Sequence, residues 1–215
     1  MLFSEPKRAE IDDHTIKLIV GVIALSLPFL VSSFHDGLTS ISQAYREGGW
    51  ARDIFVGFLF AIAAFLLAFN GHTKVQMVLS KVAAFAAMGV AMFPCKCETY
   101  EEIVPHVHGV SAAIMFLILA AFCYTFFKRA LSKGHPQAKV RAAIYAVCGV
   151  SIVLVILVLA YDGVTGGSIK SSFARLTFFG EAVGLVAFGV AWLTASRNLP
   201  LITAKSERLG PLAKL

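Results

Sequence analysis

The chain has 215 residues, of which 58% are hydrophobic and 15% charged, and its formal net charge is +6. A soluble domain is roughly half apolar and a quarter charged, so this composition indicates that a lipid bilayer is the solvent for much of the surface. The positive charge does not indicate nucleic-acid binding, because the basic residues flank apolar runs and form no stripe with interleaved aromatic residues.

Six apolar runs follow one another along the chain, over residues 16–34, 54–69, 77–93, 108–127, 142–161 and 178–195. A helix needs about 20 residues to cross the hydrocarbon of a bilayer, so loop residues must extend the second and third runs. The runs also lack the alternation that is typical of a membrane β-barrel. The sequence therefore predicts an all-α, polytopic membrane protein. Its six-transmembrane-helix bundle covers 16–195, with an N-terminal segment 1–15 and a basic tail 196–215.

The basic residues predict the orientation of this bundle, because cytoplasmic loops carry an excess of Lys and Arg. One side holds Arg46, Arg52, Lys96, Lys170 and Arg175, and all other Lys and Arg residues fall on the side of the two termini. Both termini are therefore predicted to be cytoplasmic, in a bacterial inner (plasma) membrane. The loop 128–141 is interpreted as a solvated linker that fixes this orientation.

Small residues in the predicted helices bear on packing. Gly180 and Gly184 have the spacing that lets two helices approach closely. Packing within one chain and a homo-oligomer interface are both compatible with this pattern. Membrane lipid and a larger membrane complex are the other partners that we expect.

Polar residues gather in the outer loops and at the outer helix ends. The pocket candidates are Ser42, Tyr45, Arg46, Arg52, Asp53, Asp162 and Glu181. Glu181 lies within an apolar run, where a carboxylate needs a partner, and we expect that partner to be Arg46, Arg52 or Arg175. Arg52 and Asp53 have a structural alternative, as an interfacial pair at the start of the second helix. These residues predict an outward-facing polar pocket.

Cysteine and histidine residues on the same side suggest a zinc or copper site. The metal candidates are His35, Asp36, Cys95, Cys97, His106 and His108. Thiolate and imidazole are common ligands of both metals. A disulfide between the two cysteines and a pair of unrelated thiols are the alternatives. If the fourth helix begins at Pro105, the two neighbouring histidines point in different directions, because residues two apart lie on different faces of a helix.

Several segments together resemble a family of bacterial six-helix membrane proteins of unknown function, loosely akin to the DRAM-type group. They are 40–47, 52–57, 69–71, 91–94, His108, 145–149, Glu181 and 187–192. The resemblance implies a six-helix bundle and no assigned activity. The family pattern lacks Cys95 and Cys97, which argues against a metal site common to the family. A fainter similarity links the chain to ceramidase-like membrane hydrolases, which use Ser, Asp and several His on a zinc.

Two functions follow from these residues. The first is a membrane protein whose outward-facing polar pocket serves small-molecule or lipid binding, transport, or an accessory subunit. The alternative is a zinc-dependent membrane hydrolase acting on a lipid-like substrate, with Asp36 or Glu101 as the base.

Overall fold

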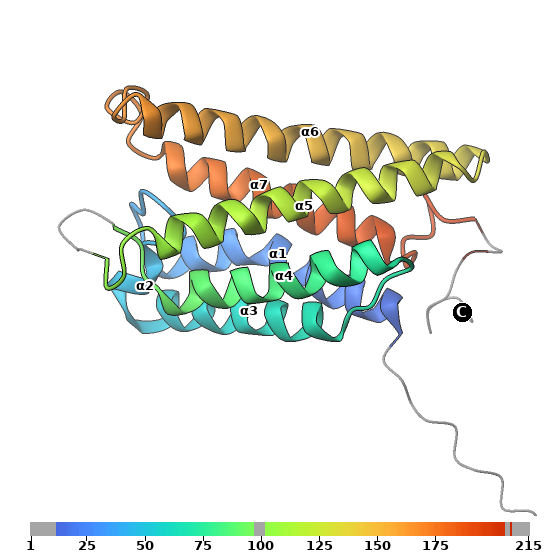
Figure 1. Cartoon of the computed structure of the whole chain (residues 1–215), viewed down its shortest axis with the longest axis horizontal. Coiled ribbons are helices and arrows are strands. Elements are labelled where there is room, and N and C mark those ends of the chain that lie inside the picture. Colours follow the sequence, from blue (N-terminus) through green and yellow to red (C-terminus); the bar gives the residue numbers. More distant parts are fainter. Residues whose placement is uncertain (1–11, 97–101, 205–206, 208–215) are drawn as a thin grey trace, which may run out of the picture.

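The described part of the chain is helical and contains no strand. The computed structural model describes residues 12–96, 102–204 and 207, and its architecture is a bundle of long helices (Figure 1). The helices are α1 (Asp13–Phe34), α2 (Ala44–Glu47), α3 (Gly49–Ala68), α4 (Lys74–Met92), α5 (Val107–Leu131), α6 (Pro136–Val164) and α7 (Leu176–Ala195). All except the short α2 are long and apolar enough to cross a membrane. The predicted six-helix membrane fold is therefore confirmed.

Helix ends agree with local capping chemistry. The side chain of Asp12 accepts hydrogen bonds from the backbone N–H groups of His14 and Thr15 at the start of α1. Thr73 caps α4 in the same way, and Pro136 occupies the first turn of α6, where its missing N–H costs nothing. These caps extend α4 and α6 at their first turns beyond the apolar runs.

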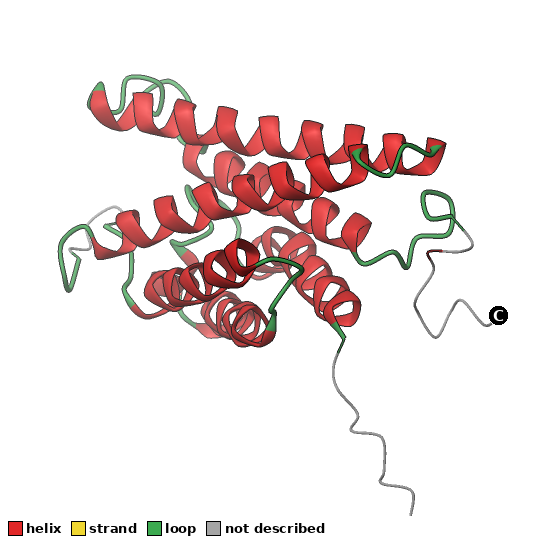
Figure 2. Ribbon diagram, turned by 45° about the vertical axis from the view of Figure 1, so that its right-hand side comes forward, coloured by secondary structure: helices red, strands yellow, loops and turns green. Residues whose placement is uncertain are grey.

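The six long helices form a closed ring of neighbours. Along this ring α1 contacts α3, α3 contacts α4, α4 contacts α5, α5 contacts α6, α6 contacts α7, and α7 returns to α1. Successive long helices run in opposite directions, as Figures 1 and 2 show. We call the end where α1, α4 and α6 begin the terminal end, because the first helix α1 begins there and the last helix α7 ends there, and the opposite end the distal end.

Small residues and aromatic side chains pack the neighbouring helices against one another. A Cβ atom on Gly189 of α7 would lie 2.8 Å from the backbone nitrogen of Leu25 in α1, so these two helices approach backbone to backbone. Gly184 instead faces the ring of Phe116 in α5. The described contacts of these glycines therefore lie within the chain. Trp192 of α7 is fully buried, and its ring lies 5.5 Å, centroid to centroid, from the ring of Phe122 in α5.

Candidate functional site at the distal end

The loop between α1 and α2 is a rigid platform at the distal end. The side-chain oxygen of Gln43 accepts hydrogen bonds from the backbone N–H (2.8 Å) and the hydroxyl (2.9 Å) of Thr39. The hydroxyl of Ser40 accepts the backbone N–H of Gln43 at 3.0 Å. The backbone N–H of Phe178 in α7 donates to the carbonyl of Thr39 at 2.9 Å. The loop is thus fastened both to itself and to the start of the last helix.

Glu181 of α7 is the acidic centre of this platform. Its Oε2 accepts the backbone N–H groups of Ile41 (2.5 Å) and Ser42 (3.4 Å), and its Oε1 accepts the hydroxyl of Ser42 at 2.9 Å. The sequence-based expectation of an arginine partner is wrong, because these uncharged donors take its place. No ion pair to Glu181 occurs within the described residues. Arg175 instead donates to the carbonyl of Leu38 at 3.1 Å.

Oε1 of Glu181 keeps room for another donor. A carboxylate offers about four lone-pair positions, and among the described residues the donors from Ile41 and Ser42 occupy three of them. The side chain of Glu181 is partly exposed and lines two cavities. An additional hydrogen-bond donor in either cavity therefore has an acceptor available.

His108 of α5 is another buried polar residue at this end. It is 6% exposed, and its Nδ1 lies 2.7 Å from the carbonyl oxygen of Phe93 at the end of α4. Because a carbonyl only accepts, Nδ1 carries the proton, and Nε2 of the neutral ring is an acceptor. His106, by contrast, is exposed and precedes α5 with φ of 66°. The two histidines diverge, as expected for a helix that begins near Pro105.

Two cavities share Ser42, His108 and Glu181. The larger, which we call the distal pocket, has a volume of about 430 Å³. Its lining is Thr39, Ser40, Ser42, Cys95, Lys96, His108, Gly109, Ala112, Ala113, Phe116, Val155, Ile156, Leu159, Ala160, Lys170, Thr177 and Glu181. The smaller lies deeper, has about 20 Å³, and is walled by core residues such as Leu27 and Leu59. It is large enough for about one water molecule. The polar groups therefore lie where the distal pocket meets the core.

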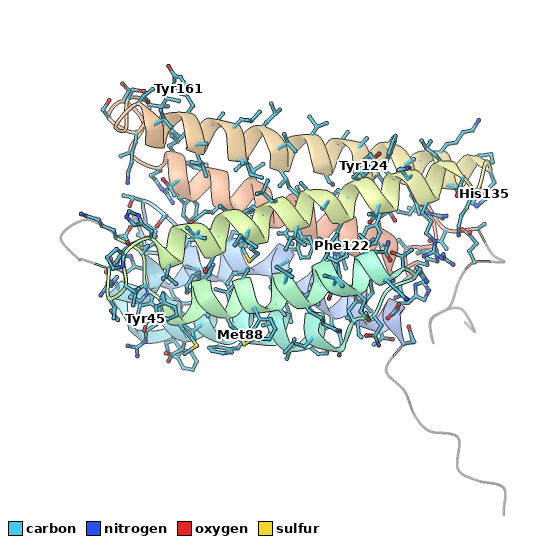
Figure 3. All side chains as sticks on the ribbon, viewed as in Figure 1. Tyr45, Met88, Phe122, Tyr124, His135 and Tyr161 are labelled. Carbon is cyan, nitrogen blue, oxygen red and sulfur yellow. The ribbon has the colours of Figure 1, made fainter. Side chains whose placement is uncertain are left out.

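The pocket has apolar walls and a charged rim. Carbon dominates the middle of the bundle in Figure 3, whereas nitrogen and oxygen gather at its two ends. Lys170 lies at the rim and is exposed. Asp162 sets its position, because one carboxylate oxygen accepts the backbone N–H groups of Ile169 (2.7 Å) and Lys170 (3.0 Å). Asp162 thus shapes the loop before α7 and does not line the pocket.

The remaining pocket candidates lie elsewhere. Tyr45, Arg52 and Asp53 line a separate surface groove of about 600 Å³ beside Met92. Arg52 and Asp53 are both exposed and pair with each other at 3.5 Å, in agreement with the structural alternative. Arg46 belongs to α2 and lines none of these cavities. The predicted single pocket is therefore divided, and of its seven candidates Ser42 and Glu181 share the distal pocket.

The metal candidates do not converge in the part of the chain that the structure describes. No group of three or more His, Cys, Asp or Glu side chains placed to hold a metal ion is found there. Cys95 takes part in a disulfide, which removes its thiolate as a ligand. The Nε2 atom of His35 lies 3.1 Å from the Oε2 atom of Glu47, and Asp36 is exposed. Cys97 and Glu101 lie outside the described residues.

Sequence reasoning missed two contributors to this site. The backbone N–H of Ile41 has no sequence signature, since every residue except proline carries one. Lys170 was counted only as a basic residue on the outer side, and its place at the rim depends on the loop that Asp162 organises. The only indication of this position in the sequence is that Asp162 lies a few residues before the loop whose backbone N–H groups it accepts.

Comparison with known proteins adds no relative. No protein-family model, no curated protein and no solved structure matches this chain.

Proposed function

We propose that this membrane protein binds a small amphiphilic molecule in its distal pocket, with an apolar body against α5 and α6 and an amine head at Glu181. The observation that carries the proposal is an acceptor position on Oε1 of Glu181 that no described residue fills, in a pocket of about 430 Å³ with apolar walls. Ligand pockets typically combine such walls with a few convergent polar groups. Because the binding site lies near the ends of the helices, the protein could extend this function to transport of the same ligand.

Glu181 contributes a carboxylate to the distal pocket, and this group favours an amine in direct contact, whereas Lys96 and Lys170 line other parts of the same pocket. Lys170 is close enough to act electrostatically on Glu181, but it makes no described ion pair with it. A carboxylate at the membrane boundary gains from a cation in direct contact, because a charge-assisted hydrogen bond is stronger than a neutral one. An ammonium group donates three hydrogen bonds, and His108, whose Nε2 is an acceptor, lines the same cavity.

The binding test compares two probes that differ only in the head. Purified protein in a nonionic detergent is heated with hexylamine or with hexanol, and unfolding is followed by circular dichroism. We expect hexylamine to raise the Tm more than hexanol, because only the amine pairs with Glu181. In Glu181→Gln this preference for the amine should disappear.

Asp53→Asn is the matched control, because Asp53 is an exposed carboxylate in the separate groove. It should keep the full preference for hexylamine. Equal stabilisation of the unaltered protein by both probes, or loss of the preference in Asp53→Asn, would overturn the proposal.

We also propose that the distal end faces out of the cell, in a bacterial inner membrane, as the distribution of basic residues predicts. Ser171 is exposed in the loop before α7, and Lys139 is exposed near the start of α6. A membrane-impermeant maleimide added to intact cells should label Ser171→Cys and leave Lys139→Cys unlabelled. The reverse pattern would invert the topology.

A further inference from the structure

A second polar cavity lies at the terminal end of the bundle, where the sequence predicted only a solvated basic linker. It has a volume of about 40 Å³ and is walled by α1, α5, α6, α7 and the segment between α3 and α4. We call it the terminal pocket. It holds five cationic side chains, namely Lys17, Arg129, Lys133, Arg141 and Arg197. No carboxylate of the described residues lines this cavity, so its chemistry is that of an anion site.

Lys17 is the most unusual of these cations. Its side chain is 2% exposed, and its ammonium lies 4.9 Å from the centre of the Phe69 ring. Within the described residues it has neither a hydrogen bond nor an ion pair. Asp13 and Asp12 attract this ammonium electrostatically without pairing with it directly, whereas Arg129 and Arg197 repel it. A buried charge without a partner is costly, so the pocket favours a ligand that supplies negative charge.

The five cationic side chains of the terminal pocket divide into two sets. Lys133 and Arg141 are already paired with Glu207, Arg141 at 2.7 Å. Lys17, Arg129 and Arg197 have no such pair among the described residues. Lys17, Arg129 and Arg197, the unpaired set, are therefore the cations that can bind an anion.

His14 adds a donor position to the unpaired set. Its Nδ1 is buried and has no hydrogen-bond partner among the described residues, and its ring lines the same pocket. A tetrahedral oxyanion such as phosphate accepts several donors at once and suits such a cluster.

An apolar groove adjoins this pocket through Tyr145, whose side chain lines both. The groove has a volume of about 360 Å³ and lies between α5 and α6. Its lining includes Tyr124 and Val150, which are 61% and 59% exposed on the outside of the bundle, where a membrane protein meets hydrocarbon. A basic pocket beside an apolar groove on the bilayer side matches the two ends of a phospholipid.

We infer that the terminal end binds a phospholipid, with its phosphate among Lys17, Arg129 and Arg197 and an acyl chain in the groove beside Tyr145. The groove favours a lipid over free phosphate, because a soluble anion would leave it unused. This is also the side where the excess of basic residues occurs, and such residues attract anionic lipids. The inference is independent of the ligand in the distal pocket.

The test measures lipid that stays with the protein. Protein extracted from vesicles of phosphatidylglycerol and phosphatidylcholine is washed in nonionic detergent and analysed by native mass spectrometry. We expect bound phosphatidylglycerol on the unaltered protein and a roughly tenfold loss of it in Lys17→Met, because the variant removes a charge-assisted hydrogen bond to the phosphate. Lys17→Met should also raise the Tm of lipid-free protein, because it removes an unpaired buried charge.

Two further variants distinguish a seated phospholipid from unspecific charge attraction and from a bound phosphate ion. Lys139→Met removes an exposed lysine outside the pocket and should keep the lipid. Val150→Trp fills the groove from its exposed side and should release the lipid without changing the Tm rise produced by sodium phosphate over sodium chloride at equal ionic strength.

Three outcomes would overturn the inference. Equal lipid loss in Lys17→Met and Lys139→Met would indicate unspecific charge. Retention of the lipid in Val150→Trp would show that the site takes a phosphate without its chain. Absence of bound lipid from the unaltered protein would remove the site itself.

Discussion

The two ends of the bundle solve the problem of charge near lipid in opposite ways. At the distal end, Glu181 enters the interior and receives its hydrogen bonds from a loop of the same chain. At the terminal end, Lys17 enters the interior, and its ammonium group has no hydrogen-bond acceptor within the described residues. A loop supplies backbone N–H groups readily, and these serve an anion. Cations need carboxylates or carbonyls, and at the terminal end Glu207 serves Lys133 and Arg141 but not Lys17.

The largest effect should come from the framework that both ends share, the contact between α1 and α7. We expect Gly189→Leu to prevent folding or to lower the free energy of unfolding by about 3 kcal/mol or more, because a side chain there meets the backbone of α1. Both pockets should be lost together. Thermal unfolding in detergent measures this. Gly57→Leu is the control, since a Cβ at Gly57 meets nothing within 4 Å.

Removal of the distal anion should be the next largest effect. Glu181→Ala leaves the donors of Ile41 and Ser42 without an acceptor, and we expect a loss of roughly 3 kcal/mol. Glu181→Gln keeps one acceptor oxygen and should lose less. Urea unfolding in detergent compares them, and equal stability of all three proteins would show that the carboxylate does not hold the loop.

Acid should weaken the terminal end selectively through Glu207. Burial raises the pKa of this carboxyl, but hydrogen bonds from Lys133 and Arg141 outweigh that and hold the pKa at about 2, against an ordinary 4.5. Its contribution, roughly 2 kcal/mol, is therefore complete above pH 4.5 and lost as the pH falls toward 2. The Tm of the unaltered protein should fall in that range more than the Tm of Glu207→Gln, and parallel curves would contradict this.

The smallest effect should be that of a single hydroxyl. Ser42→Ala removes one donor to Glu181 and leaves the backbone N–H groups, so we expect a loss of about 1 kcal/mol. Ser171→Ala, in an exposed loop, should change the free energy of unfolding by less than about 0.5 kcal/mol. A Ser42→Ala loss no larger than that of the control would show that the hydroxyl does not stabilise the platform.

Much of the fold could be predicted because lipid imposes it. Long apolar runs with basic flanks leave few alternatives to membrane-spanning helices, and the helices begin or end within a few residues of those runs. That Ser42 and Glu181 lie at the same end of the bundle could also be predicted, because Ser42 follows the first apolar run and Glu181 lies near the start of the last one, although the direct contact between them was not predicted.

The partition of the other candidates was not predictable from loop position alone. Ala51 and Phe55 face the core of the bundle, so Arg52 and Asp53, between them in sequence, face outward. That rotation depends on packing against neighbouring helices. The terminal pocket could not be predicted for a related reason, because its cationic side chains come from several helices. Counting Lys and Arg residues loop by loop indicates on which side of the membrane each residue lies, but not whether its side chain points into the bundle.

The length of α6 has a consequence for access to Glu181. Its 29 residues span roughly 44 Å at about 1.5 Å each, against a hydrocarbon layer of about 30 Å. The helix is therefore about 14 Å longer than the hydrocarbon layer is thick, and we expect its last turn to reach the lipid head groups. Leu159 and Ala160, which line the distal pocket, lie about one turn before the end of the helix. We therefore expect a ligand to enter the distal pocket laterally from the interfacial layer of the membrane. Its apolar tail would still lie in the hydrocarbon when its polar head first contacts the protein.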